Sequence, residues 1–358
     1  MYKTIPAVFA VEDTYQIMLR TEEKSFVWVK IGDQCFYDNS NGILRSNTAI
    51  HRITVPSALL DKTGKYTVYK RLLVERKPYY TETGEISQKV YDFYPVRGDK
   101  IRAYHIADAH NMIEEPVRAA RTYGKIDFLI LNGDIADNSD KLETFDNVYE
   151  LCGRITQGNI PVVFARGNHD MRGKCAEYLE YFTPVSNGRS YYTVRLGDLF
   201  AIILDCGEDK ADDHEEYGNT ICCRAYREEE TNFIKQVIKS AEYSDKNIFC
   251  RTVIVHNPFV WKEQEPFDIE DDIYNKWTEM LGSGISPDII ISGHTHKIST
   301  GNPGDDRDYR GQPCPIAVLS ELDYEGYFAG AGIEFNRNGK IKITVTDSNG
   351  KIRETYDI

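Results

Sequence analysis

Hydrophobic and polar positions follow two patterns along the chain, and the change lies near residue 97. Before it, apolar residues occur in short alternating or β-branched runs, such as SFVWVKI and KYTVYKRLLV. Turn sequences such as DNSNG, DKTGK and TETGE separate roughly six or seven of these runs, a spacing typical of a small β-sandwich. We therefore expect residues 1–97 to form an all-β accessory domain of the fibronectin-III or immunoglobulin type.

From residue 98 onwards, apolar strands alternate with helical stretches. A hairpin is expected within 191–205, turning at Gly197 and Asp198, and further short strands close the chain. Alternating strands and helices indicate a sheet covered by helices, so we expect an α/β domain over residues 98–358. The pattern predicts strands at 102–107, 127–131, 161–165, 251–255 and 288–291, and helices near 113–123, 141–157, 173–182, 225–243 and 270–281.

Polar side chains follow five of these strands at the point where each strand ends. In open α/β sheets, ligands bind beyond the carboxyl ends of the strands, so we expect the five loops to converge on one edge. In chain order the loops supply Asp108 and His110; Asp134 and Asp137; Asn168, His169 and Asp170; His256; and His294 and His296.

These residue types predict a metal site. Carboxylate, amide and imidazole ligands without thiolate suit divalent Mn, Fe, Co, Ni or Zn. Glycines at 133, 167 and 293 directly precede polar residues and predict tight turns. The spacing of Asp108 and His110 is expected to direct both side chains of an extended segment to one side, as in the pair His294 and His296. A single such motif occurs by chance in many chains, whereas five in order do not.

Composition narrows the possible partners. The chain carries 43 Lys and Arg against 56 Asp and Glu, a formal net charge of −13. This balance argues against general nucleic-acid binding and against docking on anionic lipid. No apolar stretch reaches the length of a transmembrane helix, and the N-terminal apolar run is too short for a signal peptide. The eight cysteines show no repeated C-x-x-C spacing, so we expect reduced, structural cysteines in a cytoplasmic protein.

The five motifs, D-x-H, G-D-x-x-D, G-N-H-[DE], a lone His and G-H-x-H, resemble those of the calcineurin-like metallophosphoesterase superfamily over residues 98 to about 300. The resemblance implies a four-layer α/β/β/α sandwich and a dinuclear site that hydrolyses phosphate mono- or diesters through a metal-bridging hydroxide. Its two divalent ions would bind Asp108, His110 and His296, and Asn168, His256 and His294, with Asp134 between them.

The same resemblance assigns roles beside the metals. His169 would be the acid at the leaving oxygen, oriented by Asp137, and Asp170 would only support the loop. A β-rich segment before such a domain resembles the layout of purple acid phosphatases and their bacterial relatives. Those enzymes carry Tyr where this chain has Asp137 and Gly where it has His110. Since that Tyr is the coloured iron(III) ligand, we expect no purple absorption band here.

Substrate preference stays open at this level. Asn111, Arg166 and Arg172 lie close in sequence to predicted ligands, and each is as well explained by a structural role as by contact with phosphate. Loops 206–224 and 299–313 fit either mobile rims of the site or ordinary solvated loops. Monoester and diester cleavage are not distinguished, and a non-catalytic metal-binding scaffold is the alternative. We interpret three further histidines and one acidic turn as structural or surface features: His51, His105, His214 and the turn at 212–214.

Overall fold

The computed structural model describes residues 2–40 and 42–358. Its largest sheet has ten strands, and four neighbours within it, β10, β11, β12 and β1, run parallel. The small strand β19 (Glu321–Asp323) pairs only with β20. The other nine, in spatial order, are β22 (Ile352–Asp357), β21 (Ile341–Asp347), β20 (Tyr327–Asn336), β10 (Lys100–Ile106), β11 (Phe128–Asn132), β12 (Val162–Ala165), β1 (Ala7–Val11), β2 (Thr14–Arg20) and β7 (Ile50–Pro56).

A second sheet of six strands faces the first. Its strands β14, β15, β16 and β18 are parallel, and the hairpin partner β13 forms one edge. The turn of this hairpin falls at Gly197, which has a φ of 57°, as the sequence predicted. In spatial order the strands are β13 (Tyr192–Leu196), β14 (Leu199–Ile203), β15 (Cys250–Ile254), β16 (Ile289–Ser292), β18 (Ile316–Val318) and β17 (Ser299–Gly301).

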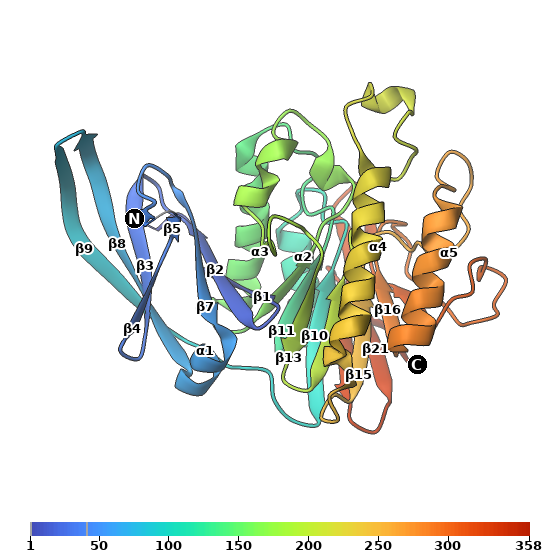
Figure 1. Ribbon diagram of the computed structural model, residues 1–358. Helices are drawn as coiled ribbons and strands as arrows, with labels where there is room; N and C mark the ends of the chain where they lie inside the picture. Colours follow the sequence, from blue (N-terminus) through green and yellow to red (C-terminus); the bar gives the residue numbers. More distant parts are fainter. Residues whose placement is uncertain (1, 41) are drawn as a thin grey trace.

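Helices cover the outer faces of both sheets (Figure 1). α2 (Glu114–Tyr123) and α3 (Asp146–Thr156) bury apolar side chains against the larger sheet, where Tyr149 packs in one cluster with Phe9 and Leu131. α4 (Cys223–Ser240) and α5 (Asp271–Met280) do the same on the smaller sheet. A third cluster fills the space between the sheets. The predicted four-layer α/β/β/α arrangement is therefore confirmed.

The predicted helix near 173–182 is only a 3-10 segment, Ala176–Tyr181. Other short helical segments contribute to the loops around the sheets, and a π-turn, Leu281–Ile285, extends α5. These 3-10 segments are Leu142–Phe145, His169–Met171, Glu215–Tyr217 and Glu242–Ser244. The helix predicted over 141–157 thus divides into a 3-10 turn followed by α3.

The N-terminal region is β-rich, as expected, and it is joined to the larger sheet. Its strands β1, β2 and β7 continue that sheet, and Phe9 of β1 pairs in parallel with Val162 of β12. The division at residue 97 thus stays a prediction, while one sheet contains strands from both sides of it. The remaining strands form a four-stranded sheet at the left of Figure 1, with one short helix, α1 (Ser57–Thr63). These strands are β4 (Gln34–Tyr37), β3 (Ser25–Ile31), β8 (Lys65–Lys77) and β9 (Tyr80–Asp92), and a separate pair joins β5 (Asn39–Ser40) to β6 (Ile43–Leu44).

Candidate metal centre and active site

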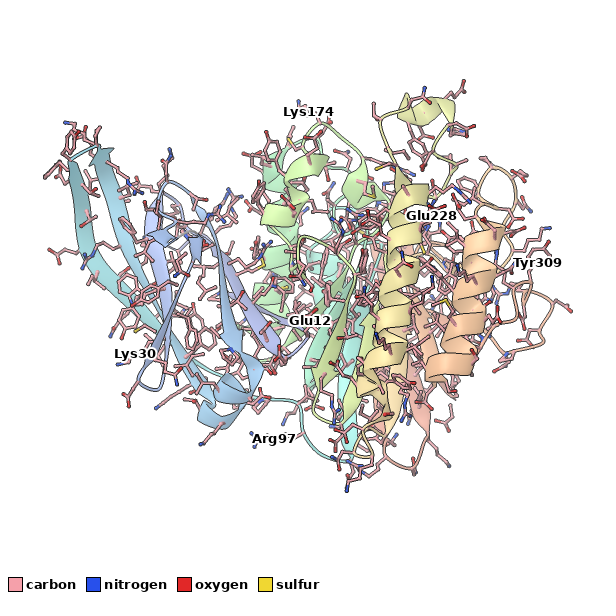
Figure 2. All side chains as sticks on the ribbon, viewed as in Figure 1. Glu12, Lys30, Arg97, Lys174, Glu228 and Tyr309 are labelled. Carbon is pink, nitrogen blue, oxygen red and sulfur yellow. The ribbon has the colours of Figure 1, made fainter. Side chains whose placement is uncertain are left out.

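The predicted site lies beyond the carboxyl ends of the parallel strands. Lys174, in the loop after β12, is at the upper end of the molecule in Figure 2, whereas Arg97, which precedes β10, is at the lower end. Loops from β10, β11 and β12 of one sheet and from β15 and β16 of the other meet at this edge. The convergence that the strand-end pattern predicted is present.

One group of ligand atoms, the first cluster, consists of Asp108, His110 and His296. Nε2 of His296 is 3.4 Å from Oδ1 of Asp108 and 3.1 Å from Nε2 of His110. The Asp108 carboxylate also accepts hydrogen bonds from the hydroxyl of Ser320 and, at 2.9 Å, from the amide of His294. Ser320 fixes this carboxylate and was not predicted, because no metal-binding motif contains it.

The second cluster consists of Asp134, His256 and His294. Nε2 of His256 lies 3.1 Å from Oδ2 of Asp134, and Oδ1 of Asn168 lies 3.0 Å from Nδ1 of His294. The Asn168 amide nitrogen donates to Asp209 at 3.3 Å, which leaves its oxygen directed at His294. Asp209, another residue that the sequence did not single out, comes from the loop after β14.

The carboxylate oxygens and imidazole nitrogens of the two clusters suit divalent cations as ligands. The surroundings of His256 are the clearest evidence for this. Its Nδ1 donates to the carbonyl of Asn132 at 2.6 Å, so Nε2 carries the lone pair unless a proton is added. That atom is buried and has no hydrogen-bond partner among residues 2–40 and 42–358. Burial lowers the pKa of His256, but the Asp134 and Asp108 carboxylates outweigh it and raise the pKa to about 10. The position therefore demands positive charge, either a proton or a metal cation.

Other histidines of the site are held neutral. Burial lowers the pKa of His294 to about 4, and burial also lowers the pKa of His110. Neutral imidazole is the form that binds metals. Nδ1 of His110 donates to the Asp137 carboxylate at 3.2 Å, which leaves Nε2 as the ligand nitrogen facing His296.

The backbone reaches these positions differently from the predicted extended geometry. Asp108 and His110 have φ values of 54° and 42°, and His294 and His296 have 74° and 52°. Non-glycine residues adopt this left-handed region rarely, and such strain concentrates at functional sites. Left-handed turns, rather than alternation along a strand, therefore bring the paired side chains together.

The three glycines before the ligands serve two purposes. Gly133 has a φ of 80°, as a tight turn requires. Gly167 and Gly293 are needed for close packing instead: an added Cβ would lie 2.2 Å from Oδ1 of Asp134 at one position and 2.4 Å from Cβ of Ala107 at the other. Only one of the three thus has the turn role that the sequence suggested.

His169 lies beside the first cluster, with its ring 4.7 Å from that of His110 between centroids. The resemblance implied that Asp137 orients it, and the contact is made by the main chain: Nδ1 of His169 donates to the carbonyl oxygen of Asp137 at 2.8 Å. The Asp137 side chain instead pairs with His110. Asp170 accepts from the amides of Asp134 and Gly167 at 3.1 and 2.9 Å, so it supports both loops, and burial together with Asp134 raises its pKa to about 7.

The predicted substrate contacts lie elsewhere. Nε of Arg166 pairs with the buried Asp205 carboxylate at 2.6 Å, and Oδ1 of Asn111 accepts from Asn147 at 2.9 Å. Neither is among the described residues that line the cavity at the site. Arg172 is closer, since its Nη1 is 3.2 Å from Nε2 of His169, and the same guanidinium pairs with Glu208 and Asp209.

His105 and the acidic turn at 212–214, both interpreted as structural, have structural partners. His105 is buried, with its ring nitrogens 3.2 Å from the Leu319 carbonyl and 3.0 Å from the Asn132 amide. The same Asn132 amide reaches the carbonyls of Val255 and Ile291 and so links the two sheets. In the acidic turn at 212–214, Asp212 accepts from the first amides of α4, so it caps that helix.

A cavity of about 760 Å³ opens over both clusters. Asp134, Asn168, His169, His294 and His296 line it on the metal side. The volume falls within the range of small-molecule sites. Tyr324, which is 73% exposed, stands beside the site, 5.9 Å from the His110 ring and 6.2 Å from that of His296.

Paired clusters of carboxylate and imidazole at the shared edge of two stacked sheets form a candidate metal centre. The model of the calcineurin-like phosphoesterase family matches residues 101–298, more than half of the chain. The chain belongs to the calcineurin-like phosphoesterase family. It is a metal-dependent phosphoric ester hydrolase, and its cofactor is a pair of divalent ions, which the two clusters fit.

A solved structure agrees on the fold. Purple acid phosphatase PPD1 from yellow lupin (Lupinus luteus) seeds aligns with a TM-score of 0.64 at 13% identity, over 99% of this chain and 74% of the lupin chain. TT1561 of Thermus thermophilus aligns less closely, with a TM-score of 0.39 at 11% identity, over 72% of this chain and 98% of its own. No curated protein matches the sequence. Among the described residues, no helix is both long and apolar enough to cross a membrane.

Proposed function

We propose that this hydrolase cleaves phosphate mono- or diesters at a dinuclear centre, with His169 as the general acid. The observation that carries the proposal is the buried Nε2 of His256, which lies 3.1 Å from Asp134 and 3.7 Å from Asp108 and has no hydrogen-bond partner among the described residues. Carboxylates and an imidazole nitrogen that converge on one point form a cation site.

The two ions would share the ligands of both clusters. The first would bind Asp108, His110 and His296, and the second would bind His256, His294 and Asn168, with Asp134 between them. When bound, the ions supply an activated water as nucleophile and neutralise charge on the phosphate oxygens. Ser320 and Asp209 would hold Asp108 and Asn168 in the required orientations.

His169 is placed to act on the leaving oxygen. The bond from Nδ1 to the Asp137 carbonyl fixes the ring, so Nε2 is the nitrogen left for the substrate. Arg172 donates to that nitrogen at 3.2 Å, so Nε2 is a proton acceptor in this arrangement. To donate a proton to the leaving oxygen, His169 would have to carry that proton on Nε2 as imidazolium, with the Arg172 contact opened.

Hydrolysis of a chromogenic monoester and a chromogenic diester with added Mn²⁺ tests the proposal. His169→Ala should retain its metal content and lose about 10²–10⁴ in kcat on the preferred substrate. Normal turnover by this variant would show that the acid is assigned to the wrong residue. Failure of the metal-loaded protein to hydrolyse either ester would favour the non-catalytic scaffold instead.

A further inference from the structure

The cavity extends well past the ligand clusters. Its volume of about 760 Å³ exceeds what a phosphate group fills, so most of it is open to the rest of the substrate. Besides residues of the clusters, aromatic and cationic side chains line the cavity, together with Glu263, Gln264, Thr295 and Ser299; the aromatic and cationic ones are Trp261, Lys262, Phe267, Lys297 and Arg307.

Of these three cations, Lys262 pairs with Asp268 at 3.8 Å, whereas Arg307 and Lys297 have no carboxylate partner among the described residues. The guanidinium of Arg307 lies 3.8 Å from the centre of the Trp261 ring and donates to the hydroxyl of Ser299 and the carbonyl of Thr300. In the described parts of the chain, 2–40 and 42–358, neither Arg307 nor Lys297 forms an ion pair. Both are exposed in the cavity of a chain whose formal net charge is −13.

The loop that carries Arg307, within 299–313, is held to its surroundings by buried polar contacts just after Arg307. Arg310 is buried and pairs with Asp268 at 2.9 Å and with Asp271 at 2.5 Å. The side-chain amide of Gln312 donates to the carbonyls of Gly301 and Cys314, both at 2.9 Å. Arg307 therefore lies three residues before a buried arginine whose guanidinium is paired with two carboxylates.

The acidic residues of the cavity do not neutralise these cations. Asp209 is already paired with Arg172 at 2.9 Å. Burial, with a contribution from Asp209, raises the pKa of Glu263 to about 7, so its negative charge is reduced near neutrality. Lys297 and Arg307 thus bring two positive charges to the cavity without an ion-pair partner among the described residues, while Asp305 and Asp308 of the same loop accept hydrogen bonds from backbone amides. Such cations attract anions.

We infer that the enzyme acts on phosphate esters that carry a second anionic group, which Arg307 and Lys297 bind while the scissile phosphate lies at the clusters. The inference rests on the proposed function. A carboxylate and a further phosphate share the chemistry, because a guanidinium donates two parallel hydrogen bonds to either oxyanion.

Three esters with the same three-carbon tail test it: 3-hydroxypropyl phosphate, its counterpart ending in a carboxylate, and propane-1,3-diyl bisphosphate. Phosphate release should give a kcat/KM at least roughly tenfold higher for an anionic tail than for the hydroxyl tail, since hydrogen bonds between charged groups are worth that much. The double variant K297Q/R307Q should reduce this ratio to near one. The better of the two anionic tails identifies the second group.

Binding of non-hydrolysable ligands provides a measurement that does not depend on turnover. Calorimetry should show that alkane-α,ω-bisphosphonates bind more tightly than the matched monophosphonates, with an optimum chain length that K297Q/R307Q abolishes. The charge-matched control is K125Q/K246Q, which removes two exposed lysines before β11 and β15, at the opposite edge of the sheets. Thermal melting of each variant shows that it is folded.

The outcomes separate the two proposals. Hydrolysis of all three esters at equal kcat/KM, or an equal loss of the ratio in K125Q/K246Q, would overturn the second anion site and leave the phosphoesterase assignment intact. No hydrolysis by the metal-loaded enzyme of either these monoesters or the chromogenic diester would count against the proposed function, and the bisphosphonate titration would still decide the anion site. Equal affinity for mono- and bisphosphonates would overturn it.

Discussion

The two ligand clusters differ in how firmly the protein holds their histidines. In the second cluster, the side chain of His256 is wholly buried and a main-chain carbonyl fixes its ring at 2.6 Å. In the first, His110 relies on the Asp137 carboxylate, whose side chain is 46% exposed, and the side chain of His296 is 30% exposed. Main-chain support is rigid, whereas a half-exposed carboxylate is mobile and screened by water.

This difference indicates that the two clusters at this edge of the sheets should bind their metal ions with unequal affinity. Ligands already fixed by their neighbours lose little freedom when a metal binds, so the second cluster should hold its ion more tightly. Asp134 and Asp108 connect the clusters, since His256 lies 3.1 Å from one and 3.7 Å from the other. Predictions can therefore address both ions together or the first ion alone.

The largest expected effect follows from Asp134→Ala. Because this carboxylate would contact both ions, its loss should release both and reduce hydrolysis to background. Elemental analysis after desalting measures the bound metal, and Asp134→Asn repeats the change with the shape preserved. Asp213→Asn is the control, since it removes an exposed carboxylate from the loop that precedes α4. Retention of two ions by the Asp134 variants would contradict the shared role.

Asp137→Asn should affect the first ion selectively. The carboxylate supports His110, while the carbonyl that holds His169 belongs to the main chain and survives the substitution. Loss of such an outer partner weakens metal affinity by about 10–100-fold. Activity measured against Mn²⁺ concentration should therefore shift to higher metal, with a smaller change in kcat at saturation. A dominant loss of kcat would show that the side chain, as the family resemblance implied, orients His169.

The sequence predicted which side chains meet at this edge, because each follows an apolar strand and parallel strands end at one edge of a sheet. It missed Ser320 and Asp209, which orient ligands from segments without a metal motif. Hydroxyl and carboxylate groups are common in loops, and only the folded chain shows which of them face Asp108 or Asn168. The left-handed turns at the paired ligands also lack a signal, because Asp and His do not require that conformation.

The continuation of the larger sheet into the N-terminal region was missed for a different reason. β1 pairs with β12, far along the chain, and long-range parallel pairing leaves no local turn sequence. One signal was present: all five residues of Ala7–Val11 are apolar, as in strands buried on both faces. The neighbouring strand Ser25–Ile31 alternates buried and half-buried residues and lies outside that sheet.

Stepwise removal of metal tests whether the two clusters differ in metal affinity. The expected effect is smaller than those of the Asp134 and Asp137 variants. Titration with a chelator should release one ion before the other, with dissociation constants that differ by roughly tenfold or more. His296→Ala should eliminate the weaker step and His256→Ala the tighter one. Simultaneous loss of both ions in the wild type would contradict the inequality, and loss of the tighter step in His296→Ala would reverse the proposed order.

The smallest expected effect is the absence of a visible absorption band, and it also concerns the first cluster. With Asp137 at the position of the coloured tyrosine, protein loaded with iron(III) should show no visible tyrosinate absorption. Tyr324 is the described tyrosine beside His110 and His296, and burial, with smaller contributions from Asp137 and Asp108, raises the pKa of its phenol. A neutral phenol is a poor metal ligand, so Tyr324 should stay unbound and Tyr324→Phe should leave the spectrum unchanged. A visible band that disappears in Tyr324→Phe would show that this side chain binds the iron of the first cluster and would contradict the prediction.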